Sequence, residues 1–198
     1  MYLLPASYTI KIWNEKNKNL GMRVRPTPKP WVVRDYIKCS GCRLCEIACS
    51  KKHEGRIWPE ASRIRVFMLV PGVEVPHLCT QCSNYPCVES CPVDALSVHE
   101  ETGAVNVDNE KCTACGLCIK ACPGMIPHLH PNKKYIVICD LCGGEPECAK
   151  ICTRAGYGAL FKGGRTPSLN YDLYAKRPEE ITANLAINLF GEKGEEFI

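Results

Sequence analysis

The chain has 198 residues, enough for one or two small domains, and only 8% of them are aromatic, so its hydrophobic core should be thin. No apolar run approaches the roughly 20 residues that a membrane span needs, so we expect a soluble chain. The formal net charge is +4, and sixteen residues are cysteine.

The first 38 residues are expected to form an N-terminal arm. Thr9–Trp13 is a candidate for a short strand, and proline at every second position in residues 25–31 predicts an extended backbone. The N-terminus has no basic n-region, no useful apolar h-region and no twin arginine. We therefore predict a cytoplasmic chain.

Residues 39–163 hold all sixteen cysteines, in four groups of four. The first and third groups have the spacing C-x2-C-x2-C-x3-C, which is known for the cysteine ligands of 4Fe-4S clusters. The second and fourth groups widen the middle gap to four and five residues. We predict four 4Fe-4S clusters, one for each group: Cys39, Cys42, Cys45 and Cys49; Cys79, Cys82, Cys87 and Cys91; Cys112, Cys115, Cys118 and Cys122; Cys139, Cys142, Cys148 and Cys152.

Two other uses of cysteine are less consistent with this spacing. Disulfides need an oxidising compartment, and cysteines within one tight turn rarely have disulfide geometry. Zinc modules usually combine two well-separated C-x2-C pairs, whereas each group here places three or four thiolates in one short loop. One zinc ion in the second or fourth group, beside three clusters, remains an alternative.

The clusters also change the meaning of the net charge. A 4Fe-4S cluster with four thiolates carries about −2, so four contribute roughly −8 and leave the loaded protein near −4. The basic side chains therefore offset cluster charge, and we do not expect nucleic-acid binding. No glycine-rich phosphate loop predicts a nucleotide or flavin.

Residues 79–123 are predicted to form a compact inner unit. Residues 91–98 and 101–108 alternate apolar and polar side chains around Gly103, which predicts a short hairpin. Cys91 and Cys122 each precede a proline, which ends the short helix carrying the cysteine. This unit resembles the bacterial two-cluster ferredoxins.

In those ferredoxins each loop gives three cysteines to its own cluster and the fourth to the other cluster. The resemblance implies the same exchange here, and a second, outer unit split around the first. Ser50 and Thr153 stand where the inner unit has proline. The implied ligand sets are Cys79, Cys82, Cys87 and Cys122; Cys112, Cys115, Cys118 and Cys91; Cys39, Cys42, Cys45 and Cys152; Cys139, Cys142, Cys148 and Cys49.

Residues 38–163 as a whole resemble the four-cluster iron–sulfur subunits of molybdenum and tungsten oxidoreductases, above all in residues 77–87 and 139–148. The resemblance implies an α+β fold of two ferredoxin-like units, one nested inside the other, with strands near residues 63–70, 135–138 and 159–161. The gap of five residues in the fourth group is short, and in this respect the chain resembles small subunits that accompany tungsten aldehyde oxidoreductases, class II benzoyl-coenzyme A reductase or some hydrogenases.

Residues 164–198 are expected to form a tail with one helix, Pro178–Phe190, which ends at Gly191. Ile181, Leu185 and Leu189 recur at helical spacing and predict its buried stripe. Both flanks are expected to embrace a partner subunit. The alternative is that they fold back over the cluster core.

No active site is evident, because each cysteine group accounts for all four corners of one cluster. We predict a non-catalytic subunit that relays electrons to or from a tungsten or molybdenum partner in an anaerobe, and on to a soluble carrier or a further redox subunit. The alternatives are a free polyferredoxin, a subunit of a hydrogenase or formate dehydrogenase complex, and a non-redox scaffold. His77, His128 and His130 are expected to cap loops or tune sulfur hydrogen bonds, and residues 51–53 to form a solvated turn.

Overall fold

The computed structural model describes residues 28–164 and 174–197. The strand expected at Thr9–Trp13 lies outside these residues. The elements are, in chain order, β1 (Pro30–Arg34), η2 (Tyr36–Lys38), α2 (Leu44–Glu54), η3 (Pro59–Ala61), β2 (Ile64–Val70), β3 (Val73–Leu78), α3 (Pro86–Glu89), β4 (Leu96–Val98), β5 (Val105–Val107), α4 (Leu117–Ala121), β6 (His128–Leu129), β7 (Ile136–Val137), η4 (Leu141–Gly144), α5 (Glu147–Arg154), β8 (Leu160–Gly164), α6 (Pro178–Phe190) and η6 (Gly191–Phe197).

Within the described residues the strands form four antiparallel pairs: β1 with β8, β2 with β3, β4 with β5, and β6 with β7. The β4–β5 pair, with Ser97 opposite Asn106, is the hairpin predicted for the inner unit. Short sheets and short helices are mixed along the chain, as expected for a ferredoxin-like fold.

The β1–β8 pair joins the end of the expected N-terminal arm to the segment after the last cysteine. Arg34 lies opposite Leu160 and Trp31 opposite Gly163. Trp31 is fully buried, so this part of the arm packs in the core. A large aromatic side chain gains free energy from this burial, and β8 gains a hydrogen-bonded partner.

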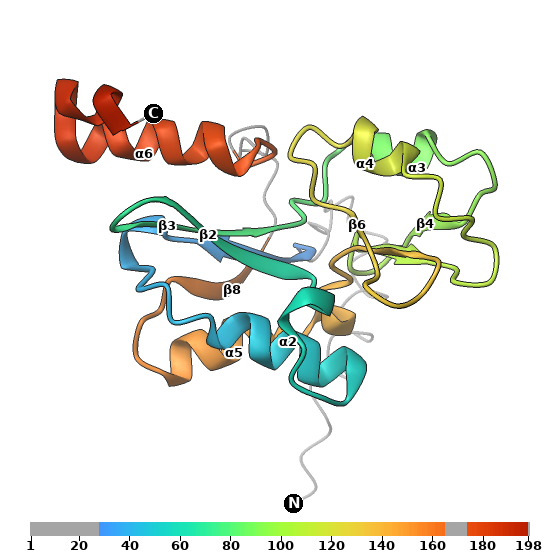
Figure 1. Ribbon diagram of the computed structural model, residues 1–198. Helices are drawn as coiled ribbons and strands as arrows, with labels where there is room; N and C mark the ends of the chain where they lie inside the picture. Colours follow the sequence, from blue (N-terminus) through green and yellow to red (C-terminus); the bar gives the residue numbers. More distant parts are fainter. Residues whose placement is uncertain (1–27, 165–173, 198) are drawn as a thin grey trace, which may run out of the picture.

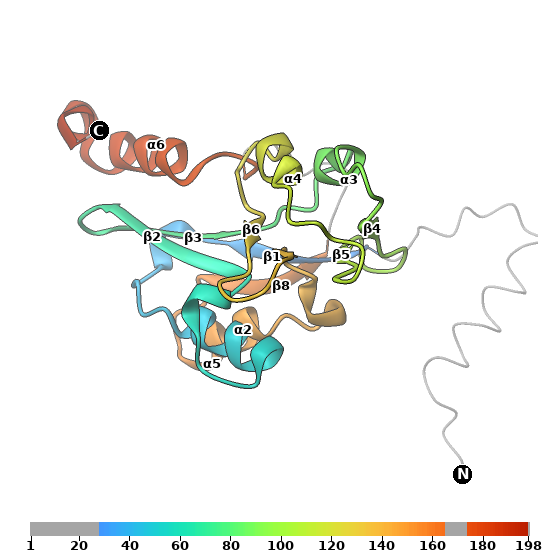
Figure 2. The same cartoon turned by 45° about the vertical axis from the view of Figure 1, so that its right-hand side comes forward.

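Two lobes are visible in Figure 1. In one lobe α2 packs beside α5 below the β1–β8 and β2–β3 pairs, and α6 lies across the opposite side of β2 and β3. The other lobe holds β4, β5 and the neighbouring helices α3 and α4. The two lobes stay distinct when the view is turned by 45° (Figure 2).

Both hydrophobic cores are built around cysteine. Val32, Ile64, Leu78 and Leu141 pack with cysteines of the α2–α5 lobe. A second set of apolar side chains, which includes Leu96, packs with cysteines of the other lobe. Aliphatic side chains alone make a small core here, so the packing depends on what fills the space between the sulfur atoms.

The helices near the fourth cysteine of each group end earlier where a proline follows that cysteine. In residues 79–123, α3 ends before Cys91 and α4 ends before Cys122, and a proline follows each cysteine. The helices α2 and α5 instead run past Cys49 and Cys152 to Glu54 and Arg154. Serine and threonine follow those two cysteines and do not force the chain out of the helix.

The C-terminal helix α6 begins and ends where predicted, but its buried stripe differs. Ile181 is 4% exposed, whereas Leu189 is 46% exposed. The buried face instead continues through Thr182 and Ala186, because α6 packs on β2, β3 and η6. None of the helices in residues 28–164 and 174–197 is long and apolar enough to cross a membrane.

Candidate iron–sulfur sites

Four small cavities lie at the cysteine groups. Four cysteines line each cavity, three from one group and one from another. We name them site I (Cys39, Cys42, Cys45 and Cys152), site II (Cys79, Cys82, Cys87 and Cys122), site III (Cys91, Cys112, Cys115 and Cys118) and site IV (Cys49, Cys139, Cys142 and Cys148).

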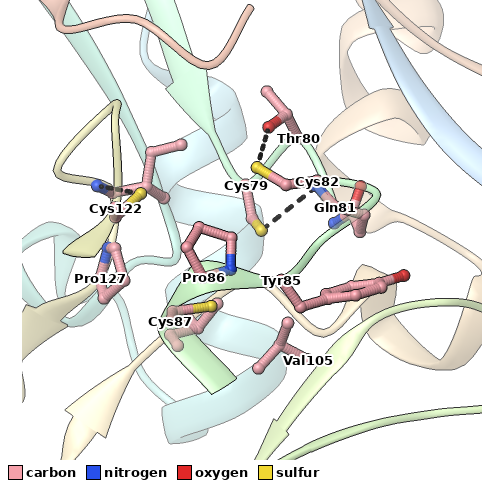
Figure 3. Close-up of a pocket in the computed structure, with 12 residues that line it drawn as sticks. Cys79, Thr80, Gln81, Cys82, Tyr85, Pro86, Cys87, Val105, Cys122 and Pro127 are labelled. Atoms are coloured by element: carbon pink, nitrogen blue, oxygen red, sulfur yellow. Dashed lines mark hydrogen bonds between the residues drawn. The ribbon is translucent and has the colours of Figure 1, made fainter. Parts of the chain in front are cut away.

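Site II shows how the local sequence brings sulfur atoms together (Figure 3). Cys79 follows β3 directly, Cys87 lies in the short helix α3, and Cys122 arrives from the end of α4. The three side chains point toward a common space, with Val105 on one wall. Cys122 is far from the other three cysteines in the sequence, but it lies close to them in space because α3 and α4 pack side by side.

The loop between the first two cysteines shares one backbone feature in all four groups. The residue before the second cysteine has positive φ each time: +68° at Gly41, +47° at Gln81, +57° at Ala114 and +56° at Leu141. Only Gly41 adopts this conformation without cost, so the other three loops store strain. Left-handed residues in such loops turn backbone N–H groups inward and form concave anion sites.

Backbone N–H groups also reach the fourth cysteine of every group. At site III, the N–H of Ala95 donates to Cys91 Sγ at 3.3 Å, and at site II the N–H of Ile126 donates to Cys122 Sγ at 3.5 Å. The corresponding donors in the outer sites are Arg63, 3.2 Å from Cys49 Sγ, and Leu160, 3.3 Å from Cys152 Sγ. Donors aimed at sulfur suit thiolates, which accept hydrogen bonds.

Burial strongly disfavours free thiolates at these sites. It raises the pKa of Cys45 and of Cys79 to about 12, and the pKa of Cys139 well above its usual value. Metal binding supplies the positive charge that deprotonates such thiols, so folding and metal loading should be coupled. No disulfide joins the sixteen cysteines, and an all-thiolate donor set suits iron–sulfur clusters.

Cys42 of site I and Cys115 of site III are the exposed cysteines among the sixteen. Tyr157, which lines site I, is also exposed. Sites I and III are therefore the most accessible from the surface. The spacing of the cysteines did not predict that Cys42 and Cys115 are exposed.

The histidines occupy two kinds of position. His77 Nε2 lies 3.0 Å from the carbonyl of Lys176, and His130 Nε2 lies 3.3 Å from Glu54 Oε2, so both rings tie separate segments together. Residues 51–53 are not a solvated turn, because they form the last part of α2. Lys51 and Lys52 are exposed, but the His53 side chain is only 11% exposed and faces site IV.

The sequence shows clear similarity to known iron–sulfur proteins. A family model described as a 4Fe-4S dicluster domain matches residues 71–160. The polyferredoxin-like subunit of the aliphatic sulfonate oxidoreductase of Pyrococcus furiosus is 55% identical over 164 residues, which cover 82% of this chain and 94% of that protein. The thiosulfate reductase electron transfer subunit PhsB of Salmonella typhi is 31% identical over 138 residues, covering 61% of this chain and 70% of that subunit.

Among solved structures, the active site complex BamBC of benzoyl coenzyme A reductase aligns at 26% identity with a TM-score of 0.40, covering 83% of this chain and 92% of that chain. The family model confirms the prediction that the chain carries 4Fe-4S clusters, and the names of the sequence relatives confirm that it serves electron transfer without being the catalytic subunit. Sixteen cysteines are consistent with four clusters. The chain contains a 4Fe-4S dicluster domain and belongs to the family of the polyferredoxin-like subunit of Pyrococcus furiosus, as an electron-transfer iron–sulfur subunit of an oxidoreductase complex.

Proposed function

We propose that sites I to IV each hold one 4Fe-4S cluster, and that the chain relays electrons through all four to or from a catalytic subunit. The observation that carries this proposal is that each of four cavities is lined by four cysteines. When bound, the clusters supply one-electron transfer. The cysteines hold them at fixed positions, and aliphatic side chains of the two hydrophobic cores surround them in part.

The proposed order of the sites is III, II, IV, I. Cys79 of site II packs against both hydrophobic cores, and one of these cores includes Cys118 of site III. Cys79 is also close enough to Cys139 of site IV that its charge helps to raise the pKa of Cys139. Cys148 of site IV is influenced in the same way by Cys45 of site I. Sites III and I would then be the two ends of the relay, and both have an exposed cysteine.

This order corresponds to two ferredoxin-like units, one inside the other. Sites II and III would form the inner unit, and sites I and IV the outer one. Two features support the nesting: the exchange of the fourth cysteine within each unit, and the N–H donor that recurs at Cys49, Cys91, Cys122 and Cys152. The proposed inner unit is residues 79–123, within residues 39–163.

We propose a tungsten or molybdenum oxidoreductase as the catalytic partner, on the resemblance of residues 38–163 to subunits of that class. The 55% identity to a subunit of an aliphatic sulfonate oxidoreductase makes an enzyme of that activity the first partner to test. Within the flanks, β1 packs in the core and α6 packs on β2 and β3, as in the alternative prediction. The rest of residues 1–38 and 164–198 is proposed to contact the partner, and the cytoplasm is the proposed location.

The test is elemental analysis of the native complex, isolated anaerobically through this chain. About sixteen iron atoms per chain are expected from four clusters of four, beyond any in the partner. Tungsten or molybdenum in the same peak would support the proposed partner, and nickel would indicate a hydrogenase. Zinc in place of iron would refute the relay.

A free polyferredoxin is the second candidate, because Cys42 and Cys115 leave both proposed ends of the relay accessible. Gel filtration of anaerobic native extract separates the two. A free carrier elutes near its mass of 22.0 kDa, and a subunit elutes much earlier.

A further inference from the structure

We propose that His53 sets the reduction potential of site IV by donating a hydrogen bond from its ring to the sulfur of Cys142. This inference rests on the proposed function, since it requires a cluster at site IV. It assigns His53 a positioning role in electron transfer, although the residue is not one of the sixteen cysteines.

The geometry fixes which atom donates. His53 Nε2 lies 3.6 Å from Cys142 Sγ and 3.4 Å from Asp140 Oδ1. A metal-bound thiolate and a carboxylate only accept hydrogen bonds. The nitrogen that faces both must therefore carry the hydrogen, which assigns the Nε2–H form of the ring.

The surroundings hold the ring in this position. His53 lies near the end of α2, and its side chain is largely buried against site IV, beside Arg63. Asp140 Oδ1 also accepts a hydrogen bond of 2.9 Å from the backbone N–H of Cys142. One carboxylate oxygen thus orients both the ligand loop and the histidine that contacts it.

This contact distinguishes site IV from the other three. Among the described residues, His53 is the one histidine whose ring lies within hydrogen-bond distance of a cysteine sulfur. The rings of His77, His128 and His130 lie near oxygen atoms, and the ring of His99 accepts a hydrogen bond from the N–H of Thr102. At site II a weaker donor, the Thr80 hydroxyl, lies 3.5 Å from Cys82 Sγ. The sites would therefore differ in potential partly through these side chains.

The direction of the effect follows from charge. A reduced cluster is more negative than an oxidised one, so a donor to its sulfur stabilises the reduced state more and raises the potential. Loss of the ring N–H should shift the potential of site IV downward. Solvent entry would also change the potential, so the replacement must fill the space of the ring.

The experiment is an anaerobic redox titration of the iron-loaded complex, followed by electron paramagnetic resonance. His53→Leu removes the donor and keeps the volume, whereas His53→Gln retains an N–H at a similar reach. His99→Leu is the matched control, because His99 is exposed and lies on the β4–β5 turn. Iron content is measured for every variant.

We expect full iron content throughout, a lower potential for one of the four clusters in His53→Leu, and a potential close to the native value in His53→Gln. His99→Leu should match the wild type. Full iron with unshifted potentials in His53→Leu would overturn this inference and leave the relay standing. A wild-type complex without four iron clusters would instead overturn the proposed function.

Discussion

At the scale of single residues, the ligand loops are held by main-chain geometry more than by side chains. The left-handed residue before the second cysteine is glycine in one loop and glutamine, alanine or leucine in the others. The shared conformation follows from wrapping a loop around one bulky group. It could not be predicted from residue type, because three of the four residues disfavour it.

Gly41 can be tested against Gly116, which lies in the ligand loop of site III. Both have positive φ, +68° and +78°, so alanine should cost about 1 kcal/mol at either position. At Gly41 the added Cβ would also lie 2.8 Å from Glu74 Cγ, whereas at Gly116 it meets nothing within 4 Å. We expect Gly41→Ala to lose its brown absorbance at a lower temperature than Gly116→Ala in anaerobic melts.

The double variant Gly41→Ala, Glu74→Ala removes the contact and should recover the difference between the two glycine variants. Equal melting of Gly41→Ala and Gly116→Ala would show that Glu74 does not confine the loop of site I.

His128 should make stability depend on pH. Burial, with a contribution from the charge of Arg65, lowers its pKa from 6.5 to about 4. The unfolded chain therefore binds a proton between pH 6.5 and pH 4 that the folded chain does not, and stability falls as the pH drops through this window. From pH 7.5 to pH 5.5 the loss attributable to His128 is about 1 kcal/mol.

The measurement compares anaerobic denaturation of the wild type and His128→Asn at both pH values. Acid lability of the clusters affects both proteins, so it is the difference between them that reports His128. Parallel pH dependence in the two proteins would contradict the lowered pKa.

At the scale of elements, the sequence was most informative where one residue type determines the backbone. The prolines after Cys91 and Cys122 and the glycine after Phe190 predicted where helices end, and alternation predicted the β4–β5 hairpin. The strand β1 was not predicted, because its pairing with β8 depends on a partner far along the chain. His53 was misjudged because it follows two exposed lysines, and only the packing of α2 beside site IV shows that it is buried.

The attachment of α6 can be tested with two isoleucines of the same helix. On this helix, which packs on β2 and β3, Ile181 is 4% exposed and Ile187 is 41% exposed. We expect Ile181→Ala to cost about 2 to 5 kcal/mol and Ile187→Ala about 0.5 kcal/mol or less. Hydrogen exchange of the α6 amides should accelerate only in Ile181→Ala, and similar exchange in both variants would mean that α6 is held by other contacts.

At the scale of the whole molecule, one lobe is built from two segments that lie before and after the other lobe in the sequence. Its helices α2 and α5 pack together although residues 79–123 separate them. The spacing of the cysteines predicted four groups, and the resemblance to ferredoxins implied how the groups exchange a ligand. What lay beyond the sequence was the set of contacts that join the lobes. Arg34 is the clearest of them, since it is a buried cation on β1 whose Nη2 donates to the carbonyl of Cys79 at 3.3 Å.

Arg34 should therefore stabilise the junction between the lobes. Its guanidinium also stacks near the rings of Trp31 and Tyr174, at 5.9 Å and 5.3 Å from their centroids. Arg34→Leu loses a hydrogen bond from a charged donor and should cost about 2 kcal/mol, with faster hydrogen exchange in β1 and around Cys79. Arg34→Lys should recover only part of this, because an ammonium group cannot reproduce the planar stacking. Arg154→Leu, at an exposed position on α5, is the control, and an equal loss in both leucine variants would show that Arg34 does not hold the lobes together.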